Sequence, residues 1–168
     1  MTGRDDTSEI ILRRATWADA YAMIAVTRAA FSVYEGFDPP FVALTETEQD
    51  VRLQMYLGGA VVAVKGSTVV GAARYKALGD GRLLFYRLAV HPDWQRRGLA
   101  ARLLNWTDSA AIRLHCDEVI LYVRKQFDRH IALYERCGFR IITDDTPTIN
   151  YNVYVAMARP VIKERNHH

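Results

Sequence analysis

The segment 83–114 places the tightest limit on the fold of this chain. An apolar run, Leu83 to Val90, breaks at a polar turn and resumes at Leu99 as an amphipathic helix. The first amides of a helix lack intrahelical partners and carry the positive end of the helix dipole. A tight basic turn with a glycine at that point therefore forms a seat for an anion such as phosphate. The pattern predicts a strand, turn and helix that bind a ligand with a pyrophosphate.

The alternative is that Arg96 and Arg97 are solvated turn residues and that Gly98 only starts a helix. The residues that follow favour the anion seat, because they supply the structural setting that such a turn needs. Apolar side chains recur three or four positions apart, as on a helix packed against a sheet: Leu99, Leu103, Trp106, Ala110 and Leu114. The next run, 119–123, is apolar on both faces, which indicates a central strand paired in parallel with the first.

The rest of the chain reads as further strands and helices. The expected strands are Ile10–Arg14, the hairpin Ala60–Lys65 with Thr68–Lys76 around Gly66-Ser67, Phe139–Thr143 and Asn150–Ala158, with Asp144–Pro147 between the last two. The expected helices run from a Thr16 cap toward Ala30, from Thr45–Glu48 to Gly58, and from an Asp128 cap to Cys137, with Gly138 in the left-handed position. This order predicts an α/β (α+β) fold with a mixed central sheet flanked by helices.

The length of 168 residues suits one domain with a full core. We expect a flexible N-terminus at 1–9, the domain at 10–160 and a C-terminal tail at 161–168. No apolar run approaches the roughly 20 residues of a membrane span. The polar N-terminus has no secretory signal, which favours a cytoplasmic protein.

Charge and cysteine content exclude other classes of function. The net charge is +3, and the arginines are spread along the chain rather than collected in one tract. We therefore expect no nucleic-acid partner, and the lack of a long apolar run leads us to expect no membrane partner. Cys116 and Cys137 have no metal-ligand spacing to any histidine, so no metal site is expected, and both cysteines are interpreted as small buried hydrophobes.

The segment from Phe31 to Leu44 has no regular period. It contains the Pro39-Pro40 pair and four rings: Phe31, Tyr34, Phe37 and Phe41. These rings either shape a ligand pocket or cap the core, and the sequence supports the two interpretations equally.

Three stretches carry a resemblance to a known family. They are Leu88–Pro92 before the basic turn, Gln95–Ala100 within it, and Leu133–Phe139 after the second helical crossover. With the order of elements, they resemble the GNAT acetyltransferase superfamily over nearly the whole chain. The resemblance implies a single-domain GNAT-like fold and acetyl-CoA as co-substrate.

The resemblance also implies roles for particular residues. The strand residues Leu88, Ala89 and Val90 would pair through their backbone with the pantetheine arm. The phosphates would be held at the turn, by Gln95, Arg96, Arg97, Gly98, Leu99 and Ala100. Tyr134 would donate a proton to the departing thiolate; the alternative is that Tyr134 is a helix aromatic that packs under the sheet.

The sequence departs from the family pattern at two places. Phe127 stands where relatives commonly have an asparagine that bonds the cofactor arm, so Asp128 or Gln126 substitutes for it or the bond is absent. The strand 83–90 lacks the glutamate that relatives often use to deprotonate the amine, and offers Tyr86 and Arg87 instead. The general base is therefore unassigned, and a water relay is one solution.

The residues expected around the acceptor are Tyr34, Tyr75, Arg87 and Tyr122. Arg87 indicates a carboxylate or phosphate on the acceptor, and a structural ion pair explains it equally well.

The resemblance implies an acyl-CoA-dependent N-acyltransferase that moves acetyl to a primary amine of a small molecule or peptide by direct attack. The cysteines are not expected to carry the acyl group. The alternative is a non-catalytic acyl-CoA-binding regulatory module. A nucleotide-binding protein fits less well, because the Gly-x-x-x-x-Gly-Lys loop is absent. A homodimer is left open.

Overall fold

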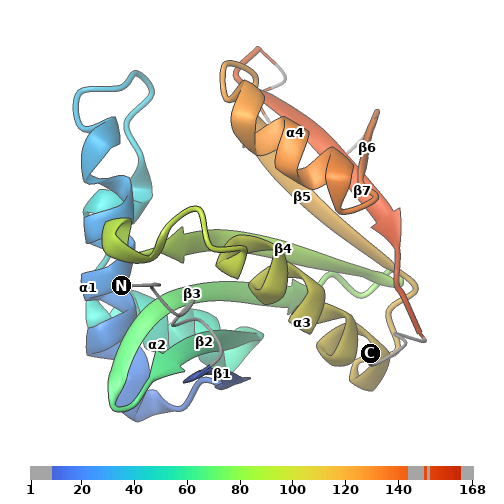
Figure 1. The fold of residues 1–168 in the computed structure, drawn as a ribbon. Coiled ribbons are helices and arrows are strands. Elements are labelled where there is room, and N and C mark those ends of the chain that lie inside the picture. Colours follow the sequence, from blue (N-terminus) through green and yellow to red (C-terminus); the bar gives the residue numbers. More distant parts are fainter. Residues whose placement is uncertain (1–8, 144–149, 151, 164–168) are drawn as a thin grey trace, which may run out of the picture. The chain divides into compact units, whose positions relative to one another are not determined.

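The computed structural model describes residues 9–143, 150 and 152–163 (Figure 1). Its helices are α1 (Ala20–Phe31), α2 (Glu48–Leu57), α3 (Leu99–Arg113) and α4 (Asp128–Arg136). Its strands are β1 (Ile10–Arg14), β2 (Gly59–Lys65), β3 (Thr68–Ala77), β4 (Arg82–Val90), β5 (Glu118–Arg124), β6 (Arg140–Ile142) and β7 (Tyr154–Pro160). None of the helices in these residues is long and apolar enough to cross a bilayer.

The strands are hydrogen-bonded in the order β1-β2-β3-β4-β5-β7-β6. The sheet is mixed, as predicted. β1 with β2, β2 with β3, β5 with β7 and β7 with β6 are antiparallel, whereas β4 and β5 are parallel, with Leu83 opposite Val119. β4 and β5 are parallel because the chain between them crosses over through α3, so that both strands start from the same end of the sheet.

The chain divides into two compact units. Unit 1 takes its described residues from Met1–Tyr75 and Arg87–Trp106, and unit 2 takes its described residues from Lys76–Tyr86 and Thr107–His168. Each unit draws on two separate stretches of sequence, so the chain is not a pair of domains joined end to end.

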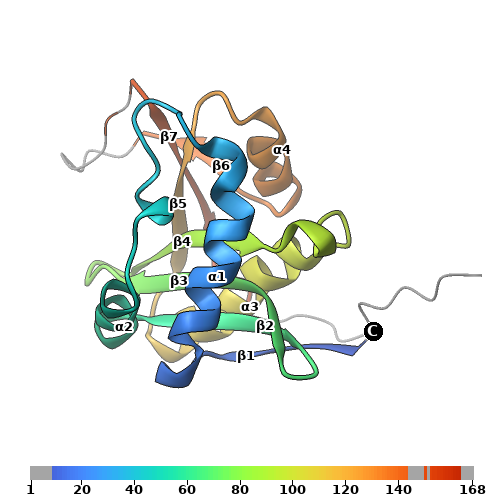
Figure 2. The ribbon, with the colours of Figure 1, turned by 90° about the vertical axis from the view of Figure 1, so that its left-hand side faces the viewer.

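Unit 1 is a layered core around β2 and β3. Figures 1 and 2 show α1 on one face of these strands and the start of α3 on the other. Gly71 permits the close approach of α3, because a Cβ there would lie 3.1 Å from Leu103 Cδ1. On the α1 side of the strands, unit 1 has a cluster of buried side chains: Ala15, Ala20, Met23, Ile24, Val26, Val51, Ala60, Val62 and Ala72.

Unit 2 is built on β5, β7 and β6, and α4 runs alongside β5 and β7 (Figure 1). A buried ion pair joins Asp108 of α3 to Arg159 of β7 at 2.8 Å. The second terminal nitrogen of Arg159 donates to the carbonyl of Cys137, just past α4, at 2.7 Å. The negative end of the α4 dipole therefore faces a buried cation, an arrangement that stabilises a helix end.

Two helix starts differ from the sequence predictions. The helix expected after Thr16 begins with a 3-10 turn at Trp17–Asp19 and becomes α-helical at Ala20. The prediction that Asp128 caps α4 is wrong. Phe127 occupies the cap position, since its carbonyl accepts the first helical hydrogen bond, from Ile131 N at 3.0 Å, and Asp128 lies inside the first turn.

The C-terminal strands are shorter than predicted. β7 begins at Tyr154 rather than Asn150, because the Asn150 carbonyl closes a turn by accepting from Val153 N and Tyr154 N. The expected turn at 144–147 lies outside the described residues. Cys116 is buried as predicted, but Cys137 is only partly buried.

Candidate functional site

The basic turn of unit 1 has the backbone that an anion seat requires. It follows a 3-10 turn at Pro92–Trp94 and leads directly into α3. Arg96 (φ 62°) and Gly98 (φ 79°) both have left-handed backbone conformations. Left-handed residues in a turn direct successive backbone N–H groups toward one concave side, where an anion binds. A Cβ at Gly98 would find no atom within 4 Å, so open space lies beside it.

Trp94 contacts two cations beside this turn. Lys65 Nζ and Arg97 Cζ each lie 4.7 Å from the centre of the Trp94 ring. An indole attracts such cations through its quadrupole, by about 0.5–1 kcal/mol each at exposed sites. The ring thus restrains Arg97, and it brings a lysine from the β2–β3 hairpin to the same place. Sequence reasoning found neither Trp94 nor Lys65.

Gln95 connects the turn to the end of β4. Its Nε2 donates to the Val90 carbonyl at 3.0 Å. The side chains of Ala89 and Val90 are buried and that of Leu88 is partly buried, which agrees with core packing by their side chains. What these strand residues offer a ligand is therefore chiefly their peptide groups.

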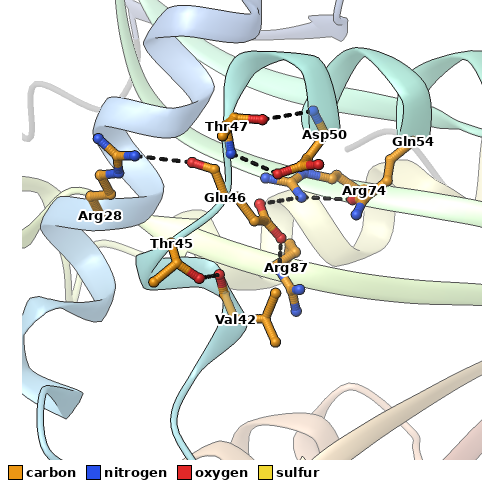
Figure 3. Close-up of polar contacts among 9 residues, drawn as sticks. All are labelled: Arg28, Val42, Thr45, Glu46, Thr47, Asp50, Gln54, Arg74 and Arg87. Atoms are coloured by element: carbon orange, nitrogen blue, oxygen red, sulfur yellow. Dashed lines mark hydrogen bonds and ion pairs between the residues drawn. The ribbon is translucent and has the colours of Figure 1, made fainter.

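A second polar cluster in unit 1 surrounds Glu46, which precedes α2 (Figure 3). Glu46 Oε1 accepts from Arg87 Nε at 2.5 Å, and Glu46 Oε2 lies 2.6 Å from Arg74 Nη1. The Glu46 and Arg74 side chains are 3% and 1% exposed, whereas Arg87 is 25% exposed. We define these three residues as the Glu46 cluster. The sequence offered two roles for Arg87 of β4, recognition of an acidic acceptor or a structural ion pair, and the structure shows the ion pair, with Glu46.

Neighbouring groups hold Glu46 and Arg74 in place. Arg28 of α1 donates to the Glu46 carbonyl at 3.0 Å, and Arg74 Nη1 donates to Gln54 Oε1 at 2.7 Å. Thr47 caps α2 by accepting from Asp50 N, and the pKa of Asp50 is lowered, chiefly by hydrogen bonds from Thr47. The segment that carries Glu46 is therefore fixed at both its backbone and its side chain.

Sequence reasoning missed Glu46 because it searched β4 itself for a carboxylate. The cluster brings one to β4 from a segment far earlier in the chain, and nothing local in the sequence signals that approach. Each oxygen of Glu46 faces a guanidinium, so this carboxylate anchors arginines rather than standing open to accept a proton. The general base remains unassigned.

The aromatic residues after α1 pack on one another in unit 1. Tyr34 stacks on Phe41 with centroids 5.1 Å apart and meets Phe31 and Phe37 edge-on. Burial raises the pKa of Tyr34. All four rings are half-buried, so both interpretations of this segment, pocket wall and core cap, stand.

Tyr75 was expected to line the acceptor pocket, and this prediction is wrong. Its side chain is 1% exposed. The ring lies 6.1 Å from that of Trp106 and covers Gly59, where a Cβ would come within 2.5 Å of it. Tyr75 is therefore part of the core of unit 1.

Unit 2 contains the other predicted residues. Tyr134 of α4 is 7% exposed, and its ring meets Phe139 edge-on at 6.1 Å. His130 lies one helical turn before Tyr134, against the ring of Phe127 at 5.3 Å, and burial lowers its pKa. Tyr122 of β5 is partly buried, and both Asp128 and Gln126 are exposed.

Unit 2 also holds the buried thiol. Burial, and then Asp117 and Asp80, raise the pKa of Cys116. Over the described part of the chain, no group of three histidine, cysteine or acidic residues is placed to hold a metal ion. A surface hollow on unit 1 is lined by Trp17, Gln49, Arg52, Leu53 and Tyr56 and includes none of the predicted site residues.

Residues 29–139, which include the basic turn, β4 and Tyr134, match the model of the acetyltransferase (GNAT) family. The chain belongs to the GNAT family. An acetyltransferase of Yersinia pestis (strain Pestoides F) is 31% identical over 86 residues. That match covers 51% of this GNAT chain and 59% of the relative, so it spans less than two thirds of the relative's length.

Solved structures share the GNAT fold over almost the whole chain. The ribosomal-protein-S18-alanine N-acetyltransferase of Escherichia coli has a TM-score of 0.71 at 19% identity, covering 95% of this chain and 99% of its own. The PaiA N-acetyltransferase of Thermoplasma acidophilum, solved with coenzyme A, has a TM-score of 0.72 at 19% identity, covering 90% and 98%. At this identity the likeness shows the fold alone.

Proposed function

We propose that this GNAT protein is an acetyl-CoA-dependent N-acetyltransferase that acts on a primary amine of a small molecule or peptide. The observation that carries the proposal is the turn of unit 1, where left-handed Arg96 and Gly98 precede the first amides of α3. Family membership and a fold relative solved with coenzyme A support the same ligand. The cytoplasmic location, the 10–160 domain and a homodimer stay predictions.

The residues of the turn suit a pyrophosphate. The backbone amides from Arg96 to Ala100 would bind the phosphates, in the open space beside Gly98. Arg97, restrained by Trp94, would add a charge-assisted hydrogen bond. Gln95 would act by fixing the turn against β4, since its side-chain amide is bonded to Val90.

In the proposed reaction the peptide groups of Leu88 and Val90 pair with the pantetheine arm, as an added strand would. A neutral amine attacks the thioester carbonyl, and an amide near Leu88 donates to the oxyanion that forms. The C–S bond then breaks, Tyr134 gives its proton to the thiolate, and the proton lost by the amine passes through water to restore the Tyr134 phenol. This direct route needs no acyl-enzyme, and the raised pKa of Cys116 disfavours the thiolate that such a route would use.

The test combines binding and turnover. Coenzyme A binding is measured by calorimetry, and thiol release from acetyl-CoA is measured with a panel of amines. Tyr134→Phe is expected to lower turnover by about a hundredfold to ten-thousandfold, the usual effect of a positioned acid, with little change in acetyl-CoA affinity. Tyr154→Phe, a tyrosine of β7 with no proposed role, is the matched control.

Three outcomes count against parts of the proposal. A loss below roughly tenfold for Tyr134→Phe would make Tyr134 a packing residue. Tight coenzyme A binding without thiol release for any amine would instead favour the acyl-CoA-binding regulatory module. Absence of coenzyme A binding would contradict both functions.

A further inference from the structure

We propose that Arg87 recognises a carboxylate carried by the amine acceptor, so that the substrates are amines with a free carboxylate close to the reacting nitrogen. This inference rests on the proposed function and names its substrate class. It is carried by the Glu46 cluster, all of whose members belong to unit 1.

The first argument is the charge of the cluster. Two guanidinium groups, those of Arg74 and Arg87, share the single carboxylate of Glu46. Among the residues that the structure describes, Nε and Nη2 of Arg74 are buried and have no hydrogen-bond partner. The nearby carboxylate of Asp50 accepts a hydrogen bond from the Thr47 backbone and also attracts the charge of Arg74. Arg74 thus has the carboxylates of Glu46 and Asp50 for its charge, whereas Arg87 shares Glu46 alone, so Arg87 is the arginine suited to bind a further carboxylate.

The second argument is the orientation of Arg87. Glu46 binds Arg87 through Nε, and Figure 3 shows the terminal end of this guanidinium on the side away from Glu46, toward Val42. Arg87 is the most exposed member of the cluster, at 25%, so its terminal nitrogens are within reach of a solute. A guanidinium held at one edge presents its other donors as a planar fork, which matches the two oxygens of a carboxylate.

The third argument is the position of Arg87 on β4. Its φ of 54° lies in the left-handed region, which is uncommon for a residue with a long side chain. Backbone conformations of this kind persist where the surrounding structure over-determines them, and they concentrate at functional sites. The next residue is Leu88, whose peptide group is assigned to the acyl arm in the proposed reaction. Arg87 is therefore adjacent in sequence to the reacting centre.

These arguments set the expected size of the effect. Hydrogen bonds to charged groups contribute about 1.5–3 kcal/mol, which corresponds to roughly tenfold to hundredfold in affinity or kcat/KM. An acceptor with a carboxylate is therefore expected to be preferred by that factor over the same acceptor as its neutral amide. Arg87→Gln is expected to remove the preference.

The binding experiment does not depend on turnover. Protein labelled with ¹⁵N at arginine is titrated, in the presence of coenzyme A, with millimolar N-acetylglycine, N-acetylalanine and N-acetylglutamate, which are products of the proposed class. The Nε–Hε signal of Arg87 is identified by its absence from the spectrum of Arg87→Lys. We expect that signal to shift with at least one N-acetyl amino acid and to stay in place with the corresponding amide.

The kinetic experiment compares kcat/KM for amino acids and their amides as acceptors. The readout is the ratio of the two values, in the wild type, in Arg87→Gln and in Arg87→Lys, which keeps the charge but loses the planar fork. Arg82→Gln, which removes an equal charge from the other end of β4, is the matched control and should keep the ratio. Circular dichroism and coenzyme A binding on the same samples show that each variant is folded.

Each outcome decides the matter. No shift with any carboxylate, an equal shift with the amide, or a ratio that survives in Arg87→Gln overturns the inference. A preference for succinyl-CoA over acetyl-CoA that Arg87→Gln abolishes would place the carboxylate on the acyl donor and overturn the acceptor assignment. If coenzyme A binds and amines are acetylated without regard to a carboxylate, the inference fails and the proposed function stands. If coenzyme A does not bind, the proposed function itself fails.

Discussion

Replacing Asp108 by alanine is expected to lower the free energy of unfolding by about 3–5 kcal/mol, the usual cost of removing one partner from a buried ion pair. Asp108 and Arg159 have side chains 4% and 2% exposed and lie 2.8 Å apart, so water cannot readily replace the lost carboxylate. Asp108 Oδ1 also accepts from the Ile162 backbone at 3.2 Å, and losing that bond adds about 1 kcal/mol. The total is a large share of the roughly 5–15 kcal/mol that holds a typical domain folded.

Two further variants separate the charge from the packing. Asp108→Asn keeps an oxygen for Ile162 but loses the charge, so its effect should be smaller than that of alanine. The double variant Asp108→Leu with Arg159→Met removes both charges and keeps apolar volume. It should recover most of the loss, because replacing a whole buried pair by apolar groups is often neutral.

Urea unfolding followed by circular dichroism measures these effects. With a slope of about 1–3 kcal/mol per molar urea, Asp108→Ala should lower the midpoint by at least about 1 M. Asp117→Ala is the control, since the ion pair of Asp117 with Lys163, 4.0 Å apart, is exposed and worth at most about 1 kcal/mol. Equal shifts of the midpoint for Asp108→Ala and Asp117→Ala would refute the reasoning. So would a double variant whose loss equals the sum of the losses measured for Asp108→Leu and Arg159→Met separately.

Three further predictions concern the turn and α4. Gly98→Asp should weaken coenzyme A binding at least about tenfold more than Gly98→Ala, because both strain the backbone but only Asp adds negative charge; calorimetry showing equal affinities would remove the phosphate-seat argument. Replacing Arg96 and Arg97 together by Ala should weaken coenzyme A binding. If the double variant loses more affinity for coenzyme A than for dephospho-coenzyme A, one of the two arginines contacts the 3′-phosphate. If it loses affinity for neither ligand, Arg96 and Arg97 are solvated turn residues. Burial lowers the pKa of His130, so the unfolded chain binds a proton at this histidine more readily than the folded chain does. The contribution of neutral His130 to the free energy of unfolding should therefore be fully present above the pKa of the unfolded chain, about 6.5, and decrease as the pH falls below it. The urea midpoint of His130→Gln should lack this decrease.

The sequence was sufficient for the parts of the fold that depend on local pattern. The hairpin around Gly66, the stripe of α3 from Leu99 and the parallel pairing through β5 are all confirmed, because hydrophobic period and glycine position reflect forces within a few residues. The errors also have a local cause. Asp128 was predicted to cap α4, but Phe127 is the cap residue. The two alternatives differ by one residue in where the helix starts, and the residue types at this point do not determine that start.

The Glu46 cluster shows what sequence reasoning could not reach. Arg74 and Arg87 meet Glu46 only because β3 and β4 carry them to the segment before α2, and no spacing in the chain records that meeting. Tyr75 failed for a related reason. An aromatic residue on a strand reads the same whether its ring faces a cavity or covers a glycine, and here the ring covers Gly59.

The Glu46 cluster also limits how this protein can evolve. A first substitution at Glu46 would leave the guanidinium of Arg74 buried at 1% exposure without its ion-pair partner, and a first substitution at Arg74 would leave a buried carboxylate that depends on Arg87 alone. Removing a whole buried pair is often harmless, while every intermediate step is costly. Descendants of this chain should therefore keep these residues together or exchange them in a coordinated way. Their co-variation, once many relatives are compared, would record that barrier.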